Sequence, residues 1–500
     1  LFDLDPTTTI ALDGFDLTFN VASGSFLTTN GVISGTGNVI KTNTGRWITD
    51  AANTYNGSTA VKNGQLRISS GNDRLPTTTV VTLGDGTSNS AGTLELEGNI
   101  SQTLAGLLTA GTGVSRVERV ASGTPTLNLN IPAGTNTFGG ILGNSGTAGG
   151  DSFSLTKTSA GILVLTNTNT YTGTTTVSAG TLTVNGSIGG SSLTTVQNLA
   201  TLNGTGTTGP LTIASGGTHN PGNSPGITTV AGNYTENGLL VTEIGTASGS
   251  VPGTDYDQVN VTSGGTVTIG GAATLSVPYL GTAGTFNPAP AQVYVIINND
   301  LADTVTGTFS GLPAGTSIDV DTPVKKLKIF YNGGDGNDVV LVSANGTPTT
   351  LYINDEFTTT SSVDGDAETT GYQQAFVGID AFATITAALA AYPAFAGTMY
   401  VNGGVSSDAM LAGGGAVTVR LIRDLANSEN DVTLTNLSGD ASDAIATQYI
   451  SATGLLTINQ GSFAGVISGT GAVTKATAGT LTLSGANGFS GATNVNAGQL

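Results

Sequence analysis

Hydrophobic residues recur two positions apart along most of this chain, with small polar residues between them. Examples are Leu127 and Leu129, Leu182 and Val184, and Leu481 and Leu483, which have Asn or Thr in the middle position. This alternation turns one face of an extended segment inward and leaves the other face to water. Glycines separate the segments at short intervals, and no helical spacing lies between them. The pattern therefore predicts many short β-strands joined by glycine turns.

A sequence repeat organises these predicted strands. The segment 31–66 returns at 465–500, where 18 of 36 ungapped positions are identical, and a further copy runs through 157–182. A unit of this size cannot bury its apolar face alone, so it must stack on neighbouring units. We expect a larger residue at Gly57 to be destabilising, on the assumption that its turn needs a positive φ. The repeat predicts the coils of a parallel β-helix.

The repeat has the order G-V-I-S-G-T-G-x-V-x-K, then G-x-L-x-L, then N-x-[YF]-x-G-x-T-x-V, then A-G-x-L. This order resembles the autotransporter-associated β-strand repeat of bacterial passenger domains. The match is complete at 465–500 and weaker in the first copy, where Arg46, Trp47 and Asp50 replace small or aliphatic residues. The resemblance implies an all-β, right-handed parallel β-helix that is exported to the bacterial cell surface. It implies no catalytic residue.

Changes in composition divide the chain into four predicted segments. They are a parallel β-helix at 1–252 with repeats at 31–66 and 139–184, a β-rich closing segment at 253–346, an acidic linker at 347–378, and the start of a second β-helix at 379–500 with its repeat at 465–500. The second segment resembles the part that closes repeat arrays in large bacterial surface proteins. Such a cap is physically expected, because a β-helix has an open sheet edge at each end.

One helix is predicted, at 380–392, as a cap on the second β-helix. Asp380 can cap its first turn, Phe382, Ile385 and Leu389 form its apolar face, and Pro393 stops it. The order of helix and following strand resembles the amino-terminal cap of right-handed parallel β-helices. The sequence lacks an initiator Met and stops within a repeat, so we expect a window of a longer polypeptide.

Composition narrows the classes of function. The net charge is −19, which disfavours nucleic acid as a partner because phosphate backbones would be repelled. No run of 18 apolar residues predicts a membrane-spanning helix. The chain has no Cys, which excludes disulfides, Cys-ligated zinc and thiol catalysis.

Two acidic stretches are candidate calcium sites. Residues 333–341, GGDGNDVVL, match the calcium-binding nonapeptide, with Asp335 and Asp338 as candidate ligands. A tight acidic turn at the end of a strand is the alternative interpretation. The second stretch contains Asp355, Glu356, Asp364, Asp366 and Glu368, and its alternative is a solvated linker. No other metal or cofactor is expected.

Catalytic residues are not expected. His219 is the single histidine and lies in a predicted loop, so no Ser/His/Asp arrangement or His-ligated metal site can be built around it. A β-helix glycosidase would use paired carboxylates from adjacent coils, yet Asp and Glu gather in the linker and cap and not in the repeats. Trp47 and Tyr55 could stack on a sugar, but Tyr171 and Phe489 occupy the same repeat position as Tyr55, which predicts a core position.

The sequence therefore favours a non-enzymatic, extracellular β-solenoid of passenger type that acts as an adhesin, surface stalk or scaffold. Its expected partners are glycans, host or neighbouring cell-surface proteins, or copies of itself. The alternative is a carbohydrate-active β-helix enzyme, a polysaccharide hydrolase or lyase. Three or more acidic residues with Lys or Arg on one sheet face would favour the enzyme, and a uniform Thr/Ser/Asn face would favour the stalk.

Overall fold

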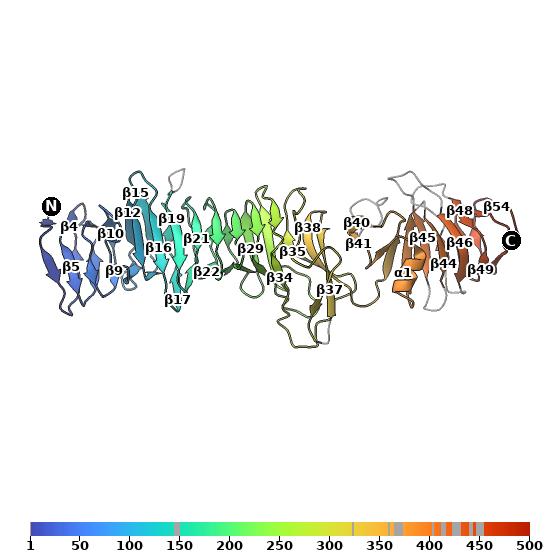
Figure 1. Ribbon diagram of the computed structural model, residues 1–500, viewed down its shortest axis with the longest axis horizontal. Coiled ribbons are helices and arrows are strands. Elements are labelled where there is room, and N and C mark those ends of the chain that lie inside the picture. Colours follow the sequence, from blue (N-terminus) through green and yellow to red (C-terminus); the bar gives the residue numbers. More distant parts are fainter. Residues whose placement is uncertain are drawn as a thin grey trace. The chain divides into compact units, whose positions relative to one another are not determined.

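The computed structural model describes residues 2–144, 151–322, 325–358, 361–364, 374–402, 405–411, 417–422, 432–439, 444–446 and 455–500. Within these residues the chain is almost entirely β-structure, with one α-helix (Figure 1). Contacts divide it into two units. Unit one contains Leu1–Thr246, Val251–Leu280 and Ile296–Gly311, and unit two contains Ala247–Ser250, Gly281–Val295 and Leu312–Leu500.

The first strands of unit one form three parallel sheets. The first sheet contains, in spatial order, β1 (Phe2–Leu4), β4 (Phe26–Thr29), β7 (Arg46–Thr49), β10 (Gly64–Ile68), β12 (Gly92–Glu97), β15 (Arg116–Val120) and β18 (Ile141–Leu142). The second contains β14 (Gly106–Thr109), β11 (Val80–Leu83), β9 (Thr59–Val61), β6 (Val39–Thr42) and β3 (Leu17–Asn20). The third, shorter sheet contains β2 (Thr9–Ala11), β5 (Val32–Gly35) and β8 (Thr54–Tyr55).

Three further sheets contain the later strands of unit one. The fourth sheet contains β13 (Ser101–Leu104), β16 (Thr126–Asn130), β19 (Ser154–Thr158), β21 (Thr175–Val177), β24 (Thr194–Val196), β27 (Leu211–Ile213), β30 (Tyr234–Glu236) and β33 (Val267–Ile269). The fifth contains β17 (Thr135–Phe138), β20 (Ile162–Leu165), β22 (Gly180–Val184), β25 (Ala200–Gly204), β28 (Thr218–Pro221), β31 (Leu239–Val241) and β34 (Thr274–Ser276). The sixth begins with β23 (Ser187–Ile188), β26 (Thr207–Thr208), β29 (Ile227–Ala231), β32 (Gln258–Thr262) and β35 (Val293–Asn298), of which only the last three residues belong to unit one.

Neighbouring strands in these sheets come from segments that follow each other in the sequence at short intervals. In the first sheet, Trp47 pairs with Leu66, Leu66 with Leu94, and Leu94 with Val117, at separations of 19, 28 and 23 residues. All four side chains are fully buried. Apolar residues thus stack in rows through the interior, which is the pairing expected of a parallel β-helix.

Unit two combines antiparallel and parallel sheets. The antiparallel strands are β36 (Ser317–Val320), β37 (Lys325–Gly333) and β38 (Asp338–Ser343), together with the pair β40 (Ser362–Asp364) and β41 (Gln374–Phe376). One parallel sheet contains β42 (Ala381–Phe382), β39 (Thr350–Ile353), β43 (Thr398–Asn402), β45 (Thr418–Ile422), β47 (Ala444–Ala446), β50 (Val466–Gly469) and β53 (Gly488–Phe489). The other contains β52 (Leu481–Leu483), β49 (Gly461–Phe463), β46 (Val432–Gly439), β48 (Leu455–Ile458), β51 (Ala472–Lys475) and β54 (Thr493–Val495), and β44 (Ser406–Met410) pairs with β46.

The helix of unit two is shorter than the predicted span 380–392. Helix α1 covers Ile385–Ala391, and its N-cap is Thr384, whose hydroxyl accepts a hydrogen bond from the amide of Ala387. Asp380 is not the cap, which corrects the prediction. Its carboxylate accepts a hydrogen bond of 2.6 Å from the amide of Phe376. A capping side chain must lie next to the first helical turn, and Asp380 is held in the preceding turn instead.

Each repeat buries one lysine against backbone carbonyls. These lysines are Lys41, Lys157 and Lys475, all fully or almost fully buried. The amine of Lys157 donates to the carbonyl oxygens of Thr158 at 2.8 Å, Ser159 at 2.8 Å and Ala179 at 3.2 Å. Lys41 makes the same three bonds, and Lys475 binds two carbonyls. Because Ala179 lies 22 residues after Lys157, each lysine joins two successive segments of strands and turns, which we call coils.

The repeat asparagine also joins two coils. Asn53, Asn169 and Asn487 each accept a hydrogen bond of 2.9 Å from a backbone amide 20 to 27 residues earlier in the chain. The side-chain amide of Asn53 donates to the carbonyls of Ala51 and Arg74, and that of Asn169 donates to those of Asn167 and Ser187. Of these acceptors, Arg74 and Ser187 come from the following segment, 21 and 18 residues later. A polar side chain can therefore lie inside the stack because the backbone satisfies it.

The glycine at position 57 is required for a different reason from the one predicted. Gly57 has no positive φ, but a Cβ atom there would lie 2.0 Å from the carbonyl oxygen of Gly37. Gly173 and Gly491, at the same repeat position, would each place a Cβ 2.2 Å from a carbonyl of the preceding coil. Close approach of two backbones is thus the constraint at this position. The positive φ belongs to Gly64, Gly180 and Gly498 in the A-G-x-L part of the repeat.

Candidate functional site

A row of nine outward-facing residues follows the fourth sheet of unit one. Strand pairing joins them in the order Thr103, Asn128, Thr156, Thr176, Thr195, Thr212, Thr235, Thr268 and Thr306. Each is half-buried or exposed, and each of the first eight lies between two buried neighbours in the sequence, as Thr176 lies between Thr175 and Val177. We call this row the threonine ladder.

The chemistry of the threonine ladder is uniform. Neighbouring parallel strands are roughly 4.8 Å apart, so the ladder repeats a hydroxyl and a methyl group at that interval, except at Asn128, which has a side-chain amide instead. A hydroxyl both donates and accepts a hydrogen bond, and none of the nine side chains carries a charge. The ladder can therefore contact a partner with many weak, neutral hydrogen bonds and apolar contacts.

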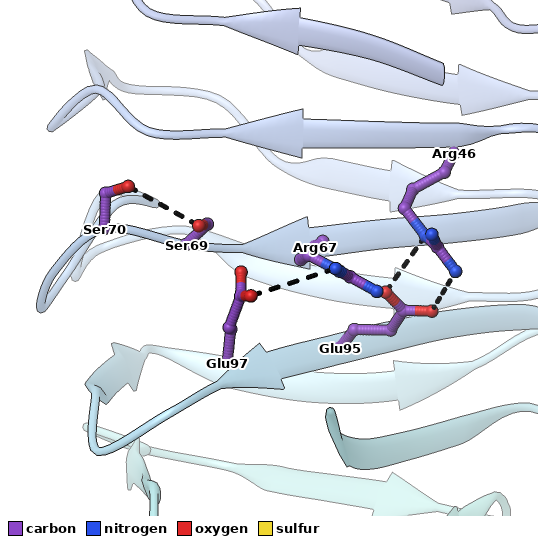
Figure 2. A network of polar contacts seen from close by, with 6 residues as sticks. All are labelled: Arg46, Arg67, Ser69, Ser70, Glu95 and Glu97. Carbon is purple, nitrogen blue, oxygen red and sulfur yellow. Dashed lines mark hydrogen bonds and ion pairs between the residues drawn. The ribbon is translucent and has the colours of Figure 1, made fainter. Parts of the chain in front are cut away.

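A charged cluster lies on the outward face of the first sheet (Figure 2). Glu95 on β12 accepts hydrogen bonds from Arg67 Nε on β10 at 2.8 Å and from Arg46 Nη2 on β7 at 3.1 Å. Its side chain is only 2% exposed, because the two guanidinium groups lie against it. Arg67 Nη1 also lies 3.9 Å from Glu97, whose side chain is about one-third exposed. These ion pairs join three successive coils.

The cluster continues onto β15. Strand pairing places Glu118 beside Glu95, and Arg116 lies two residues before Glu118 on the same strand. Burial, followed by the nearby Glu95 and Asp151 carboxylates, raises the pKa of Glu118 above its usual value. The sheet face therefore holds three glutamates and three arginines, although we expected acidic residues to avoid such faces. The signal was present in the alternating segments TLELE and RVERV, which lie outside the repeats.

The geometry of this cluster suits structural ion pairing better than catalysis. A glycosidase needs one carboxyl group to protonate the substrate and a second to act on the opposite side of the bond. Both oxygens of Glu95 are already bound by arginines, and the carboxylate is closed to solvent. The other two acidic residues of the cluster, Glu97 and Glu118, are more exposed to solvent than Glu95.

His219 is buried in strand β28 and does not lie in a loop, which corrects the sequence prediction. Its Nδ1 atom is 2.9 Å from the hydroxyl oxygen of Tyr234, and that hydroxyl donates to Glu236 Oε2 at 2.6 Å. Glu236 Oε1 accepts from the amide of Gly238 at 2.8 Å. All three side chains are fully buried, so the group has no access to a substrate.

The candidate calcium ligands lie in an antiparallel hairpin. Asp335 is exposed in the turn between β37 and β38, and Asp338 is a buried first residue of β38 that pairs with Gly333. The carboxylate of Asp338 lies against Gly334, where a Cβ would be 1.6 Å from Oδ2. Over the described residues, no three His, Cys, Asp or Glu side chains gather as a metal site. In the second acidic stretch, Asp355 and Glu356 are exposed, while Asp366 and Glu368 lie outside the described residues.

Tyr55 and Tyr171 are core residues, as predicted for their repeat position, whereas Phe489 at the same position is half-buried. Trp47, for which no core position was predicted, is buried as well. Trp47, Tyr55 and Tyr171 are fully buried. Trp47 Nε1 donates to the hydroxyl of Thr29 at 3.0 Å, and the hydroxyl groups of Tyr55 and Thr59 are 2.5 Å apart. None of the three can stack on a sugar from solvent.

Comparison with known proteins identifies the repeats. The sequence profile of the passenger-associated-transport-repeat family matches residues 39–68, 155–184 and 473–500. The chain carries three passenger repeats. They contain the buried lysines and asparagines described above. Over 120 residues the chain is also 38% identical to the adhesin BmaC autotransporter of Brucella suis biovar 1 (strain 1330).

The alignment with this relative covers 24% of the chain and only 3% of the relative. The passenger repeats and this match together indicate an extracellular location at the bacterial cell surface. In the described part of the chain, no helix has the length and hydrophobicity to cross a membrane.

Proposed function

We propose that this chain is a passenger-type adhesin or surface scaffold that binds and does not catalyse. It would consist of two right-handed parallel β-helices in series, with residues 253–346 closing the first. The observation that carries the proposal is the threonine ladder on a chain with passenger repeats. The similarity to an adhesin autotransporter supports the same function.

The threonine ladder suits a neutral, hydroxyl-rich polymer, such as a glycan chain. Each rung offers one weak contact, but contacts along a continuous polymer add because the later ones form within an existing complex. The chain has a net charge of −19, which disfavours strongly anionic polymers. Cell-surface proteins and further copies of this chain are the other partners that the proposal allows.

The test replaces three adjacent rungs. The variant T176V/T195V/T212V removes three hydroxyl groups and keeps the branched side-chain shape. The control T181V/T201V/T218V makes the same change in a paired row of the fifth sheet. We expect the first variant to lose at least tenfold in affinity for immobilised dextran, amylose or mannan, and the control to bind as the wild type does. Equal binding by both variants would refute the threonine ladder as the binding face.

The charged cluster on the first sheet favours a second candidate function, a carbohydrate-active enzyme. Its open carboxyl groups are those of Glu97 and Glu118. We expect the purified chain to leave the lengths of neutral and acidic polysaccharides unchanged, with and without calcium. Depolymerisation that is lost in the variants E97Q or E118Q would replace the adhesin proposal with the enzyme.

Calcium binding at Asp335 and Asp338 also stays a proposal. If the hairpin turn binds calcium, the ion will raise the melting temperature, and Asp338→Ala will abolish this rise. Asp319→Ala, on the neighbouring strand β36, is the matched control. Equal melting temperatures with calcium and with a chelator would identify the hairpin as an acidic turn without a metal.

A further inference from the structure

Three polar residues interrupt aliphatic rows in the core of unit one. His219 pairs with Leu202 on one side and Leu240 on the other. Tyr234 lies between Leu211 and Val267. Glu236 lies between Ile213 and Ile269. The neighbouring coils have Leu, Val or Ile at the corresponding positions. The hydrogen-bonded group His219–Tyr234–Glu236 therefore departs from the aliphatic pattern of the core.

Because His219, Tyr234 and Glu236 are buried, the free energy of the folded state depends strongly on which of them carries a charge. An isolated charge in a core is strongly unfavourable, so such groups become neutral or share hydrogen bonds. The contacts of Glu236 are the Tyr234 hydroxyl at 2.6 Å and the Gly238 amide at 2.8 Å, and no cationic side chain is among them. His219 Nε2 is buried without a hydrogen-bond partner in the described residues. The six residues paired with the three members are all aliphatic, so none of these neighbours across the strand pairings is titratable.

The distances allow two arrangements of protons. When Glu236 is ionised, Tyr234 donates to its carboxylate, and the Tyr234 oxygen can then accept the Nδ1–H proton of neutral His219. When Glu236 is protonated, its own hydroxyl donates to the Tyr234 oxygen, and Tyr234 donates to a bare Nδ1 atom. Neutral imidazole has one N–H, so the proton of His219 must then lie on Nε2.

We propose that His219, Tyr234 and Glu236 act as one buried proton-binding unit, in which proton uptake by Glu236 reverses the Tyr234 hydroxyl and moves neutral His219 from the Nδ1–H to the Nε2–H tautomer. The proton count balances with a net gain of one. Nε2 gains a proton, Nδ1 gives its proton to the tyrosine oxygen, and tyrosine gives its proton to the carboxylate. The imidazole stays neutral in both arrangements.

The pKa values of Glu236 and His219 shift in opposite directions, so their effects on the pH dependence of the free energy of unfolding cancel. Burial raises the pKa of Glu236 from 4.5 to about 7 and lowers the pKa of His219 from 6.5 to about 3. Near pH 5.5 the folded chain therefore holds its proton on Glu236, whereas the unfolded chain holds one on His219. Both states bind one proton at these sites, so the pair adds no pH dependence to folding between about pH 4.5 and 6.5.

The direct test uses the fact that the sequence has a single histidine. Labelling the full chain with ¹⁵N-histidine gives one pair of ring nitrogen resonances, which report the tautomer. We expect the Nδ1–H tautomer at pH 9 and the Nε2–H tautomer at pH 5.5, with a midpoint near 7. A doubly protonated ring at pH 5.5, or one unchanged tautomer throughout, would overturn the proposal.

Two variants test the coupling. In E236Q the amide always donates to Tyr234, so His219 should show the Nε2–H tautomer at every pH. In H219L, which copies the neighbouring coils, Glu236 is left without its compensating partner.

Relative to the wild type, the unfolding equilibrium constant of H219L should rise about tenfold per pH unit between pH 4.5 and 7. That of E236Q should rise about tenfold per unit as the pH falls below 6.5. Parallel pH profiles for the two variants and the wild type would refute the coupling. If either variant fails to fold, the tautomer titration of the wild type still decides between the outcomes.

Discussion

A lysine amine has three N–H donors, and the passenger repeats direct them at backbone carbonyls. Burial lowers the pKa of Lys41 and Lys157 to about 8, so the amines keep their protons at neutral pH and all three donors are available. The carbonyls come from two coils, as the bond from Lys157 to Ala179 shows. At the scale of the residue, this lysine is the polar centre of each passenger repeat.

Lys157→Met should destabilise unit one by about 3 kcal/mol. The substitution keeps an apolar stem of similar length but leaves buried carbonyls without donors, at about 1–3 kcal/mol each before relaxation. Lys62→Met, at a half-exposed position, is the control and should change the free energy of unfolding by less than about 0.5 kcal/mol. Urea denaturation measures both, and similar values for the two variants would contradict the role of the repeat lysine.

Gly57→Val should destabilise unit one by several kcal/mol, on the order of 3 or more, because the new side chain meets the Gly37 carbonyl. Thr176→Ser, on the outward face, should stay within about 0.5 kcal/mol. Thermal or urea melts of both variants check this difference. A small effect at Gly57 would show that the two coils can separate there at little cost.

The sequence predicted apolar core residues correctly where they alternate, as at Leu127 and Leu129. It did not predict that Lys157 and His219 are buried, because their partners come from other coils. The separations of 19, 28 and 23 residues between paired strands show the reason. Coil length varies with the loops, so spacing alone does not show which residues meet across coils.

Among the strands, the charged cluster links two that belong to the first passenger repeat, β7 and β10, to two that lie outside the repeats, β12 and β15. Arg46 reaches across β10 to Glu95 on β12, and Arg67 reaches the same carboxylate from β10. A buried carboxylate between two arginines is satisfied only while both remain. The cluster thus ties together three neighbouring strands of the first sheet, β7, β10 and β12.

Glu95→Gln should destabilise unit one by about 2 kcal/mol, since it leaves two guanidinium groups without their buried anion; their partial exposure reduces the cost. Glu97→Gln is the matched control on the same strand, and it should cost less than about 0.5 kcal/mol because its ion pair is long and open to solvent. Urea denaturation of the two variants provides the comparison. A larger loss in the Glu97 variant would show that the cluster is centred elsewhere.

At the scale of the whole molecule, buried carboxyl groups should make unit one more stable in mild acid. Burial raises the pKa of Asp257 from 3.8 to about 7, and it also raises the pKa of Glu118 and Asp151. A raised pKa means that the folded chain holds the proton more tightly than the unfolded chain. The stabilisation is complete below the unfolded pKa and is lost as the pH rises through the folded pKa.

The urea midpoint of the wild type should therefore be higher at pH 5.5 than at pH 8. Each group contributes at most about 1.4 kcal/mol per pH unit in its window. Asp257→Asn should reduce the difference between the two pH values, and Asp85→Asn, in an exposed loop, should not. A wild type that is more stable at pH 8 would show that other titrating groups dominate.

The short separation between paired strands has a consequence for how such a chain can change in length. A coil contacts the coils before and after it, and the lysine and asparagine of each passenger repeat reach only to the next or the previous one. Duplicating one complete coil would give every old strand a neighbour of the same kind, whereas losing a single residue inside a strand would turn its buried side chains outward. The number of coils can therefore change without disturbing the packing, whereas the register of a strand cannot.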